Sequence, residues 1–425
     1  MEIEPQGNLS VVMCRPPFHY GWLIIVACVL TTFSCFGLAR FAFAMLLPGM
    51  QEGLLLSYDQ MGYLGTANFV GYLLAVAVTP TVLGLWRPRL TLGSSLFLVA
   101  VTLAAMSQAQ TFGTLFSLYL LTGFGSGLAN ISGVVLIAFW FRRDRRGQAA
   151  GLMVVGSGLA IIFSGWVVPR LNLVGGSDGW RLSWLLFALI VGVLALIVSV
   201  LARNTPEEMG LQPIGQSAVV TTADAGSSYP RGSGRILVLL GLLYLVFGLT
   251  YMVYGTFFVT SLIVEHGYAH SVAGQFWSWV GFFSLFSGVL FGALSDRIGR
   301  RFGLMLVFLV QTAAYLLSGS GLGHAALMLS VVLYGVTAWS IPAIMAAAVG
   351  DYLGSARAAA GFSLITLFFA GGQVCGPAIA GIMAEYFGSF SPAFLLAALL
   401  TLAAAFFSLT LPQTTSAQPV SARHH

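Results

Sequence analysis

"GALSDRIGRR", residues Gly292 to Arg301, is a short charged turn between two long apolar runs. Within the turn, Asp296 can pair with Arg297 or another nearby arginine, or face the positive end of a helix. Gly299 allows a tight turn, and the arginines can anchor at anionic lipid headgroups. Each flanking run is long enough to cross a bilayer, which needs about 20 residues. The stretch therefore predicts two membrane-spanning helices joined at the membrane surface.

The composition of the whole chain is that of an integral membrane protein. Of its 425 residues, 58% are hydrophobic and only 7% are charged, whereas a soluble protein carries roughly 25% charged residues. In a soluble protein the net charge of +5 would suggest a nucleic-acid partner. Here membrane topology explains the charge, and we expect no nucleic acid. No metal-ligand spacing, phosphate loop or nucleophile triad is present in the sequence, so we expect no cofactor and no enzymatic activity.

Apolar runs of spanning length recur along the chain, and we count twelve of them. They lie near 20–48, 59–84, 90–108, 112–140, 148–170, 180–202, 236–264, 271–293, 303–321, 324–349, 358–384 and 391–411. Several contain internal glycines, which transmembrane helices use for close packing. The sequence therefore predicts an all-α protein with 12 transmembrane helices in contact with the lipid bilayer.

The distribution of arginine predicts the orientation of the chain, since all 18 basic residues are arginine. If the N-terminus is cytoplasmic, fifteen arginines fall on the cytoplasmic side, Arg170 and Arg181 fall outside, and Arg40 lies within a span. Cytoplasmic loops of membrane proteins carry an excess of basic residues. We therefore expect both termini in the cytoplasm, which requires an even number of spans.

One long polar segment divides the spans into six plus six. It is rich in Ser, Gly, Pro and Thr, which predicts a flexible cytoplasmic linker. The expected organisation is a cytoplasmic segment (1–19), a first six-helix bundle (20–202), the linker (203–235), a second six-helix bundle (236–411) and a cytoplasmic tail (412–425). "FGLARFAF" at 36–43 matches "FGLTYMVY" at 247–254 with an offset of 211 residues. Such duplicated halves predict a transporter with its site between them at mid-membrane depth.

"GALSDRIGRR" resembles the signature loop of the major facilitator superfamily, G-x-x-x-D-R-x-G-R-R. The resemblance implies two pseudo-symmetric six-helix bundles that work by alternating access, and we expect a monomer. It assigns the loop a role in holding the inward gate, through Asp296, Arg297, Gly299, Arg300 and Arg301. The alternative is a generic basic turn. The counterpart in the first half, "LGLWRPR" at 83–89, lacks the acidic residue.

The first span resembles the first helix of monocarboxylate transporters and their bacterial oxalate and lactate relatives. In "FHYGWLIIVACVLTTFSCFGLARF", Arg40 lies 18 residues after Trp22, where the mammalian transporters have a lysine. "GLARFAFAMLLP" and "YMVYGTFFVTSL" resemble a bacterial branch of YbfB/YjiJ-type carriers, which implies a multi-pass protein of the bacterial inner membrane. The mammalian members carry an Asp and an Arg on the eighth helix, where this chain has Ser284 and Gly288. Spans seven to twelve hold no lysine or arginine, so no second cation is available for a dianion.

Arg40 is the residue that most needs an explanation. Arginine in a helix interior costs about 2.5–3.5 kcal/mol on insertion scales, and the side chain can either extend to the outer interface or face a polar cavity. We favour the cavity, because Gly37 would open space one turn away and Phe36 and Phe43 would flank the same face. A guanidinium binds one carboxylate with two hydrogen bonds. A single charge facing a central cavity therefore suits a small monoanion.

Candidate partners for the substrate are the few polar or aromatic side chains within spans. They are Asn68, Tyr119, Asn130, Tyr251, Tyr254, Tyr334, Trp339 and Gln373. For any one of them, a hydrogen bond between helices is an alternative to substrate contact. No acidic residue lies deep in a span, so proton coupling would use protonation of the substrate or a peripheral group, Glu265, His266 or His270.

The sequence thus favours a secondary active or facilitative transporter of a small organic anion, most simply a monocarboxylate such as lactate or pyruvate. An exporter of amphipathic or drug-like molecules is the alternative. The many aromatic residues would suit such an exporter, but the lone Arg40 does not. Symport, antiport and uniport all stay open.

Overall fold

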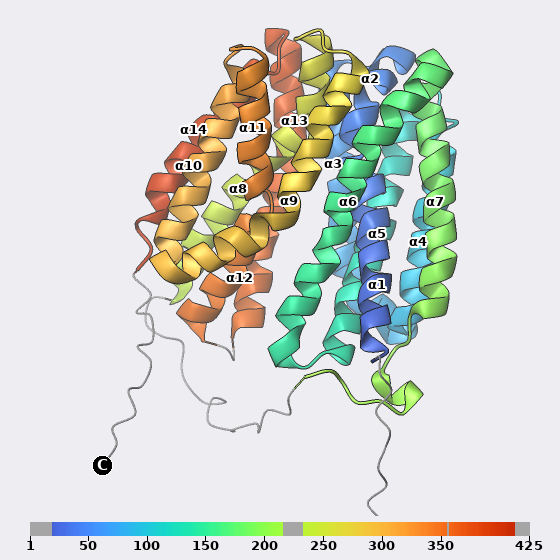
Figure 1. Ribbon diagram of the computed structural model, residues 1–425, viewed down its shortest axis with the longest axis vertical. Coiled ribbons are helices and arrows are strands. Elements are labelled where there is room, and N and C mark those ends of the chain that lie inside the picture. Colours follow the sequence, from blue (N-terminus) through green and yellow to red (C-terminus); the bar gives the residue numbers. More distant parts are fainter. Residues whose placement is uncertain (1–18, 216–232, 355–356, 413–425) are drawn as a thin grey trace, which may run out of the picture.

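The computed structural model describes residues 19–215, 233–354 and 357–412. In these parts the chain is almost entirely helical (Figure 1). The first half, here called the N half, contains α1 (Gly21–Thr32), η1 (Phe33–Phe41), α2 (Phe43–Leu54), α3 (Tyr58–Leu85), α4 (Pro88–Met106), α5 (Phe112–Trp140), α6 (Arg143–Gly175), η2 (Gly176–Asp178), α7 (Gly179–Leu201) and η3 (Pro206–Met209). The second, the C half, contains α8 (Ser233–Val264), α9 (His270–Ile298), α10 (Arg300–Gly319), α11 (His324–Thr337), α12 (Ser340–Leu353), α13 (Ala358–Phe387) and α14 (Ser391–Ser408).

These helices make twelve crossings, as the sequence predicts. The described parts contain 11 helical segments long and apolar enough to cross a membrane. One of them, Asp144–Leu201, has 58 residues and would measure about 87 Å as a single helix, against a hydrocarbon core of about 30 Å. It turns at Gly176–Asp178, so it holds two crossings, α6 and α7. Two other crossings are interrupted: the first contains η1, and the tenth breaks between α11 and α12.

Local sequence explains where several helices begin. Ser57 and Gln60 form a capping box at the start of α3, which satisfies free backbone N–H groups. Pro88 occupies the first turn of α4, where its missing N–H costs nothing. Gly299 separates α9 from α10 with a φ of 89°, a conformation that favours glycine. The predicted tight turn is therefore present.

The start of the predicted linker is packed against the N half. The backbone N–H of Arg142 donates to the carbonyl of Ile214 over 2.9 Å, and Ile214 donates to the carbonyl of Trp140 over 2.9 Å. The indole N–H of Trp140 donates to the carbonyl of Arg203 over 2.9 Å. Residues 203–215 therefore pack against the N half, where some of their backbone groups find hydrogen-bond partners. The rest of the predicted linker, up to 232, lies outside the described residues.

The two halves meet most closely at one end of the bundle. Their main contacts run between α3 and α13, α6 and α9, and α2 and α8. A Cβ atom on Gly62 would lie 2.4 Å from the carbonyl oxygen of Pro377, and one on Gly274 would lie 2.2 Å from that of Gly165. In Figure 1 the ribbons approach at this far end and diverge toward the opposite end, where residues 203–215 lie at the start of the predicted linker. We call the two the far end and the linker end.

Candidate binding site between the two halves

The helix that carries Arg40 changes its winding over the segment that includes this residue. Over Phe33–Phe41 the backbone forms a π-helical segment, in which the N–H of Ala42 donates to the carbonyl of Gly37 over 2.9 Å. Segments of this kind are rare and often lie at functional sites. The expectation that Gly37 opens space beside Arg40 is wrong. A Cβ atom at Gly37 would lie 1.9 Å from the Cβ of Ala160, so this glycine lets η1 pack against α6.

Arg40 is buried and does not reach for the membrane surface. Only 8% of the residue is exposed, and its Nε donates to Oδ1 of Asn68 over 2.9 Å. The guanidinium carbon lies 4.8, 4.6 and 4.8 Å from the ring centres of Phe36, Phe69 and Tyr72. These are cation–π distances. The buried Nη2 has no hydrogen-bond partner, and an unsatisfied buried donor costs about 1–3 kcal/mol or more. This nitrogen is therefore available to an anionic acceptor.

A small cavity beside Arg40 is lined by both halves. The N half contributes Arg40, Phe41, Phe43, Gly65, Asn68, Phe69 and Tyr119, and the C half contributes Met252, Gly255 and Thr256. Its volume of about 10 Å³ is roughly that of one water molecule. A carboxylate with a carbon skeleton needs more room, so binding requires the halves to separate here.

Two of the predicted N-half residues hold Arg40 in place. The amide of Asn68 also donates to the backbone carbonyl of Tyr119 over 3.4 Å, and the hydroxyl of Tyr119 donates to the carbonyl of Arg40 over 3.5 Å. Asn130 lies one layer further back, where its amide donates to the hydroxyl of Tyr72 over 3.0 Å. Tyr72 was missed from the sequence. It lies four residues after Asn68 on α3, and residues at this spacing share a helix face.

The predicted C-half residues separate into two groups. Tyr251 accepts a hydrogen bond at its hydroxyl from Gln373 over 2.7 Å and one at its carbonyl from the hydroxyl of Tyr334 over 2.9 Å. The ring of Trp339 lies 6.4 Å from that of Tyr251 and 5.6 Å from that of Phe41, so it connects the two halves.

Tyr254 faces the interior of the C half instead. Its hydroxyl bonds to Ser330 over 3.0 Å, and its ring stacks on Tyr334 with centres 3.9 Å apart. The structure therefore brings Tyr251, Trp339 and Gln373 together near the interface and leaves Tyr254 in the packing of its own half.

The charged turn between α9 and α10 is held by two carboxylates. Arg300 pairs with Asp296 at 2.5 Å and with Asp351, at the end of α12, at 2.6 Å. Arg301 instead lies over the ring of Phe302 at 4.5 Å, and Arg297 is exposed. The expected pairing of Asp296 with an arginine of its own loop is present, and it lies within the C half. The gating role of this turn stays a prediction.

Comparison with known proteins agrees with this architecture. Residues 32–409 match the family described as "Uncharacterised MFS-type transporter YbfB", where MFS denotes the major facilitator superfamily. The chain belongs to this family. It is a multi-pass membrane transporter of the major facilitator type, and the resemblance to the YbfB branch is confirmed. The family consists of transporters rather than enzymes.

Individual relatives of this YbfB-type transporter are distant. The chain is 24% identical to the phosphoglycerate transporter protein of Salmonella typhimurium over 42% of its own length and 39% of that protein. It is 22% identical to the hexuronate transporter of Bacillus subtilis over 85% of its own length and 87% of that protein. The chain thus spans about two fifths of the first curated relatives that it matches, with 39% and 42% of their lengths covered.

Among solved structures, the crystal structure of a D-xylose-proton symporter superposes with a TM-score of 0.73. The sequences are 14% identical, and the superposition covers 94% of this chain and 99% of that one. At this identity the likeness shows the major facilitator fold and no more.

Proposed function

We propose that this protein transports a small organic monoanion, a monocarboxylate such as lactate or pyruvate, by alternating access between its two halves. The observation that carries the proposal is the buried guanidinium of Arg40, which lines a cavity shared by both halves and has an unpartnered Nη2. Among the described residues, Arg40 is the only charged side chain that is buried. A carboxylate would satisfy the free nitrogen and neutralise the charge.

The substrate class follows from the balance of charge. The C-half wall offers the neutral groups of Tyr251, Gln373 and Trp339, so one negative charge matches the site. The rings of Phe36, Phe69 and Tyr72 around the guanidinium favour a compact or planar carbon skeleton. Relatives named as phosphoglycerate, hexuronate and tartrate transporters also act on acids. They support an organic anion as the broader class.

We place the linker end in the cytoplasm of a bacterium, because most of the arginines lie there. The protein would then be a monomer in the inner membrane with both termini inside. The tight contacts at the far end, such as the backbone N–H of Tyr58 on the carboxylate of Glu385 at 2.8 Å, would close the outer side. The structure would accordingly represent a state closed to the outside.

The proton is our proposed coupling ion. Of the three peripheral candidates, Glu265 accepts hydrogen bonds from the backbone of Phe390 over 2.5 Å and from Ser261 over 2.6 Å. His266 bonds to the carbonyl of Ser261 over 3.1 Å. His270 alone touches the other half, through Asn172 at 3.4 Å. That contact makes His270 the group whose protonation would alter the closed far end.

Uptake into proteoliposomes tests the proposal. Labelled lactate, pyruvate, a lactate amide and oxalate would be compared on the wild type and on Arg40→Ala, with Arg170→Ala as the matched control. Arg170 rests on the ring of Trp166 at the surface, with its guanidinium carbon 3.9 Å from the ring centre. We expect monocarboxylates to be taken up by the wild type and the control but not by Arg40→Ala.

Equal uptake by Arg40→Ala would overturn the assignment. Transport of neutral or cationic amphipathic compounds, unaffected by Arg40→Ala, would support the exporter alternative instead.

A further inference from the structure

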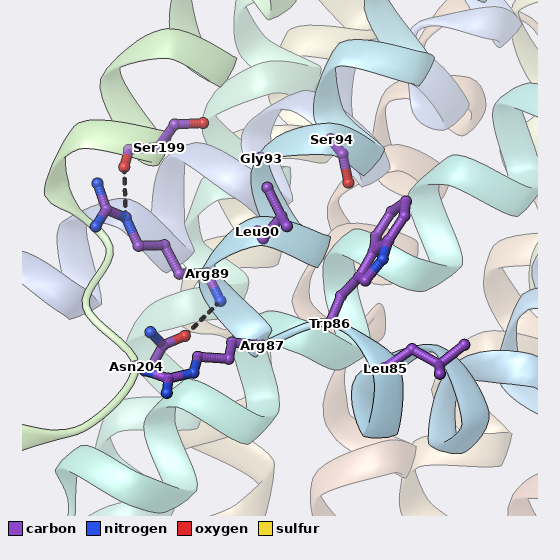
Figure 2. Close-up of a pocket in the computed structure, with 9 residues that line it drawn as sticks. All are labelled: Leu85, Trp86, Arg87, Arg89, Leu90, Gly93, Ser94, Ser199 and Asn204. Atoms are coloured by element: carbon purple, nitrogen blue, oxygen red, sulfur yellow. Dashed lines mark hydrogen bonds between the residues drawn. The ribbon is translucent and has the colours of Figure 1, made fainter.

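A pocket of about 490 Å³ opens at the linker end of the N half, far from Arg40. It is lined by Leu85, Trp86, Arg87, Arg89, Leu90, Gly93, Ser94, Ser199 and Asn204, which come from the α3–α4 turn, α4 and the end of α7 (Figure 2). In this view Arg89 and Trp86 extend to opposite sides of Leu90. The pocket therefore has a cationic side and an apolar side.

The cationic side differs from its repeat-mate in the C half. Arg89 and Arg300 are separated by 211 residues, the same offset that relates the two halves. Arg300 is neutralised by two carboxylates, at 2.5 and 2.6 Å. Arg89 is fixed by neutral groups instead: its Nε donates to the carbonyl of Ser199 over 2.9 Å, and its backbone N–H donates to Asn204 over 3.0 Å. These contacts hold the Arg89 side chain in position. Unlike Arg300, Arg89 has no direct salt bridge to a carboxylate among the described residues.

The charges around Arg89 leave an excess of positive charge. Arg87 is 80% exposed in its side chain and pairs with Glu208 at 3.4 Å. Hydrogen bonds from Asn204 and the nearby Arg87 and Arg89 lower the pKa of Glu208, so this carboxylate stays ionised. It accepts from Asn204 over 3.1 and 2.9 Å, which commits its oxygens to the linker segment. In the adjoining segment, Arg203 adds one positive charge and the exposed Glu207 adds one negative charge. Three arginines therefore outnumber two glutamates in this region.

The apolar side lies where the helices leave the membrane. Leu85 is 79% exposed, Leu90 58% and Trp86 50%. All three lie at the junction of two helices of spanning length, so in a bilayer they would lie near its surface. Tryptophan is enriched at this level of membrane proteins. A free anion would gain nothing from these side chains, whereas a molecule with an acyl chain would cover them.

We propose that this pocket binds an anionic phospholipid of the cytoplasmic leaflet. The phosphodiester and its negative headgroup would lie against Arg87 and Arg89, and an acyl chain would run along the exposed side chains of Leu90 and Trp86. The leaflet follows from the orientation proposed above, and the pocket itself does not depend on Arg40 or on the transported substrate. A juxtamembrane arginine contributes roughly 1 kcal/mol toward anionic lipid.

Lipid titration of the full chain in neutral detergent, read by native mass spectrometry, tests this site. The probes would be phosphatidylglycerol, phosphatidylcholine and inorganic phosphate. We expect the wild type to bind phosphatidylglycerol preferentially and Arg87→Ala/Arg89→Ala to bind it about 30-fold more weakly, which is the loss of two such contacts. Arg170→Ala is the matched control, because Arg170 is an exposed arginine near the far end of α6, away from this pocket. It should bind as the wild type does.

Two further variants distinguish a lipid site from a site for a free anion and from a misfolded double variant. Arg87→Lys/Arg89→Lys should retain most of the binding, because the charge is kept, and this variant also guards against misfolding of the alanine pair. Leu90→Asn should weaken lipid binding without affecting any binding of phosphate. Unchanged phosphatidylglycerol binding in the double alanine variant would overturn the proposal. So would displacement of the lipid by millimolar phosphate, which would indicate a free-anion site, or an equal loss of binding in Arg170→Ala.

Discussion

Arg40 and Tyr251 occupy corresponding places in the two halves, yet their surroundings differ. Both lie in the first span of their half, 211 residues apart. Arg40 lies within a π-helical segment and is surrounded by three aromatic rings, whereas Tyr251 lies in the uninterrupted α8 and bonds to Gln373. The duplicated backbone supplies two walls of one site, and substitution has made one wall cationic and the other neutral. Under the proposed function, a site built in this way would recognise one negative charge rather than two.

The largest expected effect is the difference between substituting Arg40 in the cationic wall and Tyr251 in the neutral wall. Arg40→Ala should weaken monocarboxylate binding by about 30-fold to several thousand-fold, since losing a desolvated charge pair costs roughly 2–5 kcal/mol. Tyr251→Phe removes one neutral hydrogen bond, so it should cost only about 3- to 10-fold. Affinities measured by isothermal titration on both variants check this. Equal losses in the two would show that charge does not distinguish the walls.

The second-largest effect on substrate affinity is expected at Asn68, which holds the Arg40 side chain in position. Asn68→Ala removes the acceptor of Arg40 Nε, a bond to a charged group that contributes about 1.5–3 kcal/mol, so substrate affinity should fall roughly 10- to 150-fold. Asn130→Ala is the matched control, because Asn130 acts behind Tyr72 rather than on the guanidinium. Its loss should stay below about 10-fold. A larger effect at Asn130 would place the substrate on the other side of Tyr72.

Packing of the duplicated spans offers a smaller test. Gly37 and Gly248 are repeat-mates, and a Cβ atom would lie 1.9 Å from the Cβ of Ala160 in one case and 2.3 Å from the carbonyl oxygen of Phe369 in the other. Gly37→Ala and Gly248→Ala should each destabilise the protein by about 1–3 kcal/mol, because both force a backbone shift. Thermal unfolding in detergent measures this, with Gly84→Ala, which meets nothing within 4 Å, as the control. A melting temperature unchanged by Gly37→Ala would contradict the close contact of η1 and α6.

The smallest effect is expected at the charged turn. Asp296→Asn removes one of the two carboxylates on Arg300, and because the Asp296 carboxylate is exposed, the pair contributes about 0.2–1 kcal/mol. If the turn holds the inward gate, labelling of cysteine reporters from the cytoplasmic side should rise by up to about 5-fold. Asp351→Asn tests the second carboxylate in the same assay. Unchanged accessibility in both variants would remove the gating role and leave the turn as a structural connection.

Much of the fold could be predicted because the bilayer imposes one-dimensional rules. The length of an apolar run and the side on which arginines fall are properties of the sequence alone. The predicted spans therefore agree with the helices, and Pro88 and Gly299 explain where two of them start or end. The packing of the start of the linker was harder to predict from the sequence, because the contacts of Ile214 with Trp140 and Arg142 join residues about 70 positions apart.

The candidate site was predicted in part. Arg40, Asn68 and Tyr119 meet as expected of a cluster, whereas Tyr254 turns toward Ser330 within its own half. Residue type and depth were sufficient to propose these side chains. They could not reveal which face of each helix points to the interface, since that depends on how helices rotate against their neighbours.

The sequence by itself determined that this protein is a twelve-span transporter in two duplicated halves, with one charge inside a span and no cationic counterpart in the second half. The spans, the repeat and the lone charge need only composition, spacing and the offset of 211 residues, whereas the transporter class rests on the resemblance of "GALSDRIGRR" to the superfamily loop. The tertiary structure decided what Arg40 does with its charge: the π-helical segment and the contact of Gly37 with Ala160 hold it beside Asn68 and three rings. A buried charge is tolerated only where partners from other helices are already in place, and such partners are set by packing rather than by position along the chain.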